Sequence, residues 1–70
     1  MNTQQKLIAA LEARGSQRFG AHLKGCVRLT RPMGGYYFVG SKGSLRYGWV
    51  RSDSVPVSDA TRAMLLEGRP

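Results

Sequence analysis

Between residues 34 and 50, two stretches rich in aromatic and β-branched residues flank a glycine-containing segment, and this pattern predicts a β-hairpin. Residues 36–39 read YYFV, aromatic and β-branched side chains that favour a pleated, half-buried surface. Residues 44–50, SLRYGWV, continue the pattern after a glycine-containing stretch. A four-residue loop over 40–43 suits this spacing, because Gly43 can adopt a positive φ without a Cβ penalty. The hairpin holds five of the six aromatic residues and is therefore the expected centre of the fold.

The register of this hairpin decides which side chains face the core. We expect Phe38 to lie opposite Leu45, because that pairing gathers the apolar side chains on one face. Tyr36 then lies opposite Tyr47, and Trp49 lies further along the same face. A slip of one residue would exchange the two faces. In the expected register the opposite face carries Tyr37, Val39, Ser44 and Arg46.

Helical spacing of apolar residues predicts an amphipathic helix over residues 3–14. Leu7, Ile8 and Leu11 fall on one side, and they are expected to cover the apolar face of the sheet. Asn2, followed three positions later by a glutamine, forms a capping-box pattern, and a glycine follows the last helical residue.

A third strand is predicted at residues 26–30, where apolar and polar residues alternate between Gly25 and a proline. Val27 and Leu29 are expected to face the core, while Arg28 and Thr30 face outward. Cys26 would point outward or lie at the end of the sheet.

Residues 15–25 are broken by three glycines and have no regular pattern. Phe19 and Leu23 are the expected points of contact with the core. His22 has no second histidine or clustered carboxylate nearby, so we interpret it as a loop histidine rather than a metal ligand.

A second helix is expected at residues 59–67, after a polar loop over 51–57. Ser58 is a good N-cap, and an aspartate in the first turn complements the helix dipole. Ala60, Met64 and Leu65 could face inward. The expected fold is one small α+β domain over residues 1–70, a three-stranded antiparallel sheet in the order α-β-β-β-α with both helices on one face.

Charge indicates a class of partner. The chain has eleven basic and four acidic residues, a net charge of +7, and no acidic residue lies between positions 13 and 52. A basic segment interleaved with aromatic residues is the footprint of a nucleic-acid partner. The alternative is a basic surface that only keeps the protein dispersed. The candidate DNA- or RNA-binding residues are Arg28, Arg31, Lys42, Arg46 and Arg51, which would contact phosphates, and Tyr37, which could stack on a base beside Arg46.

Other chemistry has little support in the sequence. The single cysteine excludes an intrachain disulfide and a cysteine-rich zinc cluster, and no cofactor motif is present. The glycines around Lys42 lack the strand-to-helix context of a phosphate-binding loop. One histidine and four scattered carboxylates argue against catalysis. The longest apolar run near the start, LIAAL, is too short for a membrane span or a signal peptide, so we expect a cytoplasmic protein.

The second half of the chain resembles small uncharacterised proteins of bacteriophages and prophages in proteobacteria. The resemblance extends from Tyr36 to Leu66 and includes YYFVGSKGSLRYG, followed by SDSVP and a short helix. It implies a bacterial cytoplasm and a mobile-element origin, but no activity.

Two hypotheses follow. The first is a small, non-enzymatic nucleic-acid-binding protein that contacts mainly the phosphate backbone, without sequence preference. The second is a phage-type accessory protein that binds a host protein or forms a homodimer, through the outer strand of the hairpin or through the face of Tyr37 and Val39.

Overall fold

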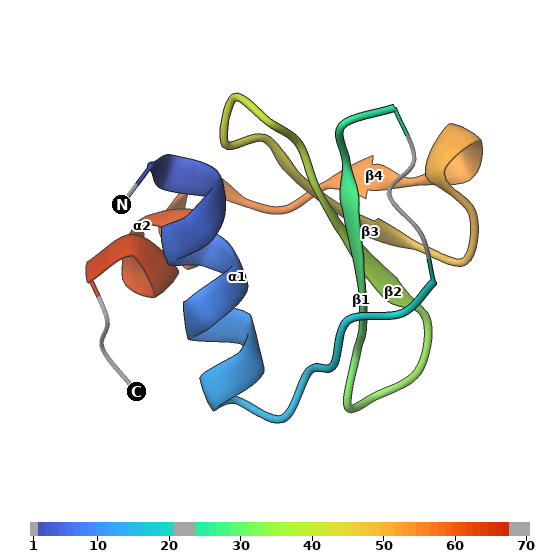
Figure 1. Ribbon diagram of the computed structural model, residues 1–70, viewed down its shortest axis with the longest axis horizontal. Helices are drawn as coiled ribbons and strands as arrows, with labels where there is room; N and C mark the ends of the chain where they lie inside the picture. The colour runs from blue at the N-terminus through green and yellow to red at the C-terminus, as the bar shows by residue number, and fades with distance from the viewer. Residues whose placement is uncertain (1, 21–23, 68–70) are drawn as a thin grey trace.

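The computed structural model describes residues 2–20 and 24–67, and Figure 1 shows an antiparallel sheet with two helices on one side of it. The sheet has four strands in the order β1-β2-β3-β4, so the α+β class is confirmed but the expected strand number was one too low. Along the chain the elements are α1 (Thr3–Ala13), β1 (Val27–Thr30), β2 (Tyr36–Val39), β3 (Leu45–Gly48), the short 3-10 helix η1 (Arg51–Asp53), β4 (Val55–Pro56) and α2 (Asp59–Glu67).

Helix α1 begins and ends as its local sequence predicts. The Asn2 side chain accepts a hydrogen bond from the Gln5 amide at 2.8 Å, and the Gln5 side chain accepts one from the Asn2 amide at 3.1 Å, which completes the capping box. Gly15 follows the helix with a φ of +99°. The Gln4 side chain donates hydrogen bonds to the carbonyls of Gly25 and Val39, so α1 is fixed to the sheet by polar contacts as well as by packing.

The core lies between the two helices and the face of the sheet that they cover, which we call the inner face. The predicted burial of the apolar stripe on α1 is confirmed, as is that of Val27 and Leu29 in β1. Leu65 is the buried residue of α2, whereas Ala60 and Met64 are exposed, against expectation. The core consists of Leu7, Ile8, Leu11, Val27, Leu29, Val39, Leu45 and Leu65.

The hairpin register differs by one residue from the expected one. Val39 pairs with Leu45, and Tyr37 pairs with Tyr47. The cause is the loop, because the Gly40 amide donates to the Ser44 carbonyl and the Gly43 amide donates to the Gly40 carbonyl, both at 2.9 Å. With Gly43 at φ +86°, this is a three-residue loop rather than a four-residue one.

The slip turns the side chains of β2 to the faces opposite to those expected, whereas Leu45 of β3 faces the core as expected. Val39 and Leu45 lie in the core, and Tyr37 packs against it. Tyr36, Phe38 and Arg46 therefore lie on the opposite side of the sheet, the outer face, because neighbouring strand residues point to opposite faces.

Strand β4 lies within the segment expected to be a polar loop. Its two residues pair with β3, Val55 with Tyr47 and Pro56 with Arg46. A two-residue strand that contains a proline has too little alternation for the sequence pattern to reveal it. Since β3 lies between β2 and β4, the outer strand of the hairpin is interior to the sheet, and Val39 is fully buried. Neither surface expected to bind a protein partner is therefore available.

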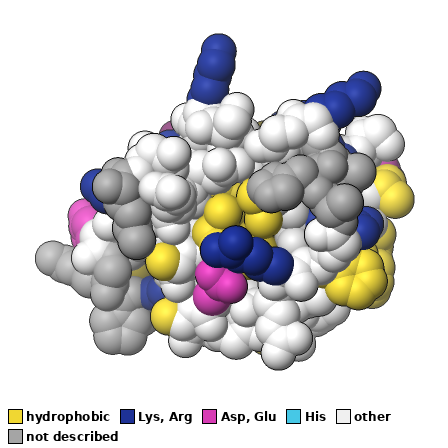
Figure 2. Space-filling model, in the orientation of Figure 1, with side chains coloured by type: hydrophobic (Ala, Val, Ile, Leu, Met, Phe, Trp, Pro, Cys, Tyr) yellow, Lys and Arg dark blue, Asp and Glu magenta, His cyan; other side chains and the backbone are white. Residues whose placement is uncertain are grey.

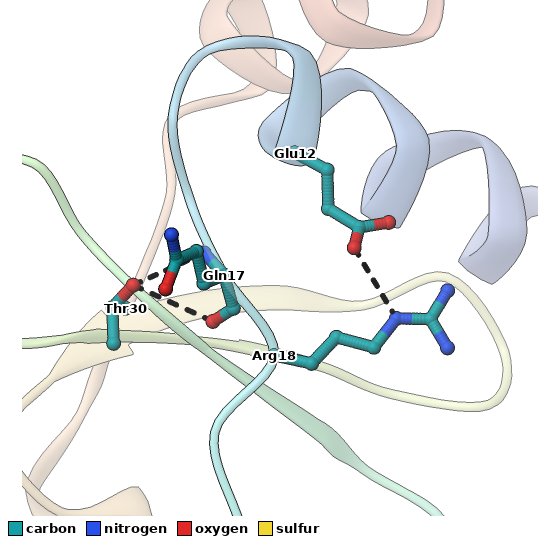
Figure 3. A network of polar contacts seen from close by, with 4 residues as sticks. All are labelled: Glu12, Gln17, Arg18 and Thr30. Atoms are coloured by element: carbon teal, nitrogen blue, oxygen red, sulfur yellow. Dashed lines mark hydrogen bonds and ion pairs between the residues drawn. The ribbon is translucent and has the colours of Figure 1, made fainter.

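The free edge of β1 is covered by residues 17–19. The Thr30 amide donates to the Gln17 carbonyl, and the Phe19 amide donates to the Arg28 carbonyl, both at 2.8 Å. The Thr30 hydroxyl also accepts from the Gln17 amide at 3.0 Å (Figure 3). Both sheet edges are thus protected, one by this segment and the other by a proline-containing strand. Phe19 itself is 46% exposed, so its expected core contact is wrong, while Leu23 and His22 lie outside the described residues.

Candidate nucleic-acid interface

The outer face of the sheet carries the predicted basic residues closest to one another. Arg28 in β1 and Arg46 in β3 both pair with Phe38 of β2, so the two arginines flank one buried ring. Phe38 is buried but does not belong to the core on the inner face. The outer face therefore has a small apolar cluster of its own, bordered by cationic side chains.

A cavity of about 560 Å³ opens at Arg46, and we call it the basic pocket. Three cationic side chains and one hydroxyl line it, and none of its described lining residues is acidic. Positive charges gathered at one concave surface favour an anionic ligand over a neutral one. The lining residues are Lys24, Arg46, Arg51 and Ser52.

Arg46 is held in place at the pocket by Ser54. Its Nε donates to the Ser54 hydroxyl at 2.8 Å, and its Nη2 donates to the Ser54 carbonyl. The same hydroxyl donates to the Arg51 carbonyl at 2.6 Å, which links the two cationic residues through one buried serine. A guanidinium fixed in this way loses little further side-chain entropy when it binds an anion.

Arg51 lies against Cys26, which is buried at the start of β1. Burial raises the pKa of the Cys26 thiol, while the charge of Arg51 and its hydrogen bond to the sulfur partly oppose that rise. The thiol is therefore neutral at physiological pH and does not offset the charge of the pocket. A buried, neutral thiol is typical of a structural rather than a reactive cysteine.

Lys24 reaches the pocket from a strained backbone position. Its φ is +51°, and among the described non-glycine residues no other has a positive φ. Such a conformation costs about 1–2 kcal/mol for a residue with a Cβ, and Gly25 directly after it also has a positive φ, of +80°. Strain of this kind occurs at functional sites more often than elsewhere. Sequence reasoning did not assign Lys24 to the site.

Aromatic rings continue the outer face beyond Arg28. The ring of Tyr36 lies 5.4 Å from that of Phe19 and 6.3 Å from that of Trp49, in an edge-on arrangement with the latter. The Arg28 guanidinium lies over Phe19 at 4.8 Å and over Tyr36 at 5.2 Å. Trp49 is 72% exposed, and the space-filling view shows hydrophobic side chains at the end of the molecule farthest from the helices (Figure 2).

The six predicted site residues do not form one surface. Arg28, Arg46 and Arg51 lie on the outer side of the sheet, and Lys42 is exposed at the hairpin tip. Tyr37 lies on the inner face, so its expected place beside Arg46 is wrong. The rings next to a cation on the outer face are those of Phe19, which is exposed, and Tyr36, which is half-buried beside Trp49. Arg31 also lies on the inner side, over the rings of Tyr37 and Tyr47.

Comparisons with protein-family models, with curated proteins and with solved structures found no match to this chain. Within residues 2–20 and 24–67 no three His, Cys, Asp or Glu side chains gather in a way that could hold a metal ion. Neither described helix has the length and apolar character needed to cross a bilayer.

Proposed function

We propose that this protein binds nucleic acid through the outer face of its sheet, with phosphates in the basic pocket. The observation that carries the proposal is the convergence of Lys24, Arg46 and Arg51 on one cavity that no described acidic residue lines. Guanidinium groups bind phosphate through charge-assisted hydrogen bonds, which are stronger than neutral ones. The resemblance to phage proteins implies a bacterial cytoplasm, where such a partner is abundant.

The proposed binding is non-enzymatic and largely independent of sequence. Phosphate contacts fix position and supply affinity, whereas base identity is read by side chains that reach base edges. The cations of the basic pocket lie on strand β3, on the loop before β1 and on the three-residue helix η1, which is too short to enter a major groove. Counting the three pocket cations and Arg28, three or four phosphates would be contacted. For a single strand the slope of log K against log salt should then be about −2 to −3.

The test compares two charge reversals that change the net charge equally. Arg51→Glu alters the basic pocket, whereas Lys6→Glu alters the exposed side of α1, on the opposite side of the sheet. The assay is fluorescence anisotropy of short labelled single- and double-stranded DNA and RNA at two salt concentrations, with circular dichroism to verify folding. We expect Arg51→Glu to weaken binding by about tenfold or more, the equivalent of one charge-assisted contact. Lys6→Glu should have a much smaller effect.

Equal losses for the two variants would mean that only net charge matters and that the pocket has no special role. No binding by the unaltered protein at low salt would refute the proposal as a whole.

A second candidate function is contact with a protein partner, either a host protein or a second copy of the chain. It is favoured by exposed apolar side chains at one end of the molecule: Met33 is 92% exposed, Trp49 72% and Val50 54%. Trp49 packs next to Gly34, the neighbour of Met33, so these residues lie close together. Exposed apolar surface of this kind marks interaction sites. A partner recovered from nuclease-treated lysate, and lost with Trp49→Ser, would favour this function.

A further inference from the structure

Arg31 is a half-buried cation that has no hydrogen-bond acceptor among the described residues. The other half-buried arginines within the described chain each donate to an oxygen: Arg14 to Ala10, Arg28 to Phe19, Arg46 to Ser54 and Arg62 to Gly43. No side-chain nitrogen of Arg31 has such a partner, and its Nε is fully buried. A buried donor without an acceptor is uncommon and is often explained by a missing water or ion.

The Arg31 guanidinium lies over two tyrosine rings. Its central carbon lies 4.6 Å from the ring centre of Tyr47 and 5.3 Å from that of Tyr37. Cation–π contacts of this kind stabilise the charge but accept none of the N–H groups, which lie in the plane of the guanidinium. The fork of donors at the terminal nitrogens therefore remains available to a bidentate oxyanion.

A second cavity, of about 360 Å³, lies on the inner side of the sheet at this arginine. Its polar groups converge from two elements. The hydroxyls of Tyr37 and Tyr47 come from the sheet and have no hydrogen-bond partner among the described residues. Ser58 and Thr61 come from the start of α2, where the Ser58 hydroxyl accepts the Thr61 amide at 3.3 Å. Val57 adds an apolar wall.

We propose that this cavity, the Arg31 pocket, binds a compact organic oxyanion, either a carboxylate or a phosphate ester. The guanidinium supplies the charge and the paired donors, and the two phenol hydroxyls supply further hydrogen bonds. The tyrosine rings and Val57 accommodate an apolar body. The volume of the cavity is near the lower end of the range for ligand pockets, and it suits a ligand with no more than one ring. The pocket is on the opposite side of the sheet from the basic pocket, so it does not depend on nucleic-acid binding.

The test follows the Nε–H signal of Arg31 by ¹⁵N NMR while sodium benzoate, phenyl phosphate or sodium chloride is added at constant ionic strength. The first two are expected to shift the signal saturably in the millimolar range, and chloride is not. Tyr47→Phe removes one hydroxyl and keeps the ring, so it should weaken binding about three- to tenfold. Arg31→Lys keeps the charge but loses the planar pair of guanidinium donors, so it should weaken binding of the anions by at least tenfold. Because this variant has no arginine Nε–H signal at position 31, the affinity is read from the NMR signals of the Tyr47 ring.

Arg28→Lys is the matched control, because it makes the same change on the outer face of the sheet. It should leave the affinity of the Arg31 pocket for benzoate and phenyl phosphate unchanged. If benzoate and phenyl phosphate give no saturable shift, the pocket does not bind such anions. If Arg31→Lys and Arg28→Lys weaken anion binding equally, the binding does not depend on which arginine is changed, and the proposal is also overturned. Should Arg31→Lys fail to fold, the Tyr47→Phe result decides alone, and an unchanged affinity there contradicts the assigned pocket.

Discussion

Ser54 connects the stability of the fold to the geometry of the basic pocket, and its removal is the sharpest test of that connection. It is a buried residue between η1 and β4, and its hydroxyl accepts from Arg46 and donates to the Arg51 carbonyl. Ser54→Ala removes both hydrogen bonds. The bond from Arg46 to the Ser54 carbonyl remains, so the guanidinium is loosened rather than orphaned.

The expected cost follows from these two bonds. A neutral hydrogen bond contributes about 0.5–1.5 kcal/mol and one from a charged donor about 1.5–3 kcal/mol, so the two bonds together contribute about 2–4.5 kcal/mol. Because Arg46 keeps its bond to the Ser54 carbonyl, we expect Ser54→Ala to lower the free energy of unfolding by the lower part of that range, about 2–3 kcal/mol. For a domain of this size that corresponds to a fall in Tm of roughly 10–20 °C. A core this small rarely supplies more than about 3–5 kcal/mol, so the loss would be a large part of the total.

Urea and thermal unfolding followed by circular dichroism measure this directly. Ser41→Ala, an exposed serine in the hairpin loop, is the matched control and should change stability by less than about 0.5 kcal/mol. In a double-mutant cycle, Arg46→Met should cost about 1 kcal/mol less in the Ser54→Ala background than in the unaltered protein. If Ser54→Ala costs no more than Ser41→Ala, the hydrogen bonds assigned to Ser54 do not hold the pocket.

Three further predictions concern backbone strain and the buried thiol. Lys24→Gly should stabilise the fold by about 1 kcal/mol, because glycine adopts the positive φ without a Cβ penalty, and should weaken oligonucleotide binding. Unfolding titrations would show the gain in stability, and anisotropy titrations would show the loss of affinity. Gly43→Ala should lower the free energy of unfolding by more than about 1–2 kcal/mol in urea titrations, since its Cβ would meet Thr3 Cγ2 at 2.5 Å. Cys26 should react slowly with a thiol reagent at neutral pH because burial raises its pKa, and Arg51→Gln should raise that pKa further and slow the reaction at a given alkaline pH; a faster reaction would contradict the assigned contact.

The raised pKa of Cys26 also determines the direction in which this thiol changes the free energy of unfolding as pH rises. A group whose pKa is higher in the folded than in the unfolded protein contributes stability that is present below the unfolded pKa and is lost as pH rises through the folded pKa. Cys26 therefore contributes a fall in stability on the alkaline side. Cys26→Ala should remove that part of the alkaline fall, which unfolding titrations at neutral and alkaline pH would show.

The features that the sequence predicted correctly are set by neighbouring residues. The capping box of α1, its buried stripe and the alternation in β1 each depend on spacings of two to four residues. The turn chemistry of Gly43 was also predicted correctly, as a positive φ. What failed was the loop length, because one residue more or less leaves the local pattern almost unchanged while it turns the side chains of β2 to the opposite faces of the sheet.

The candidate site was harder to predict because it depends on contacts distant in sequence. Lys24 enters the basic pocket only through an unfavourable backbone conformation, and Arg51 enters it through η1 and the two-residue β4. Arg31 and Arg46 look alike in the sequence, as basic residues close to tyrosines. Only the structure shows that they lie on opposite sides of the sheet, where Arg46 is bonded to Ser54 and Arg31 has a buried, unsatisfied Nε.

The most direct test of the proposed interface is a ¹H–¹⁵N NMR titration of the labelled protein with a short single-stranded oligonucleotide at low salt. Binding at the outer face predicts saturable shifts at the backbone amides of Lys24, Arg28, Arg46 and Arg51, with little change along α1, and loss of these shifts when salt is raised. Shifts confined to α1 and α2, or no saturable shifts at all, would contradict binding at the outer face.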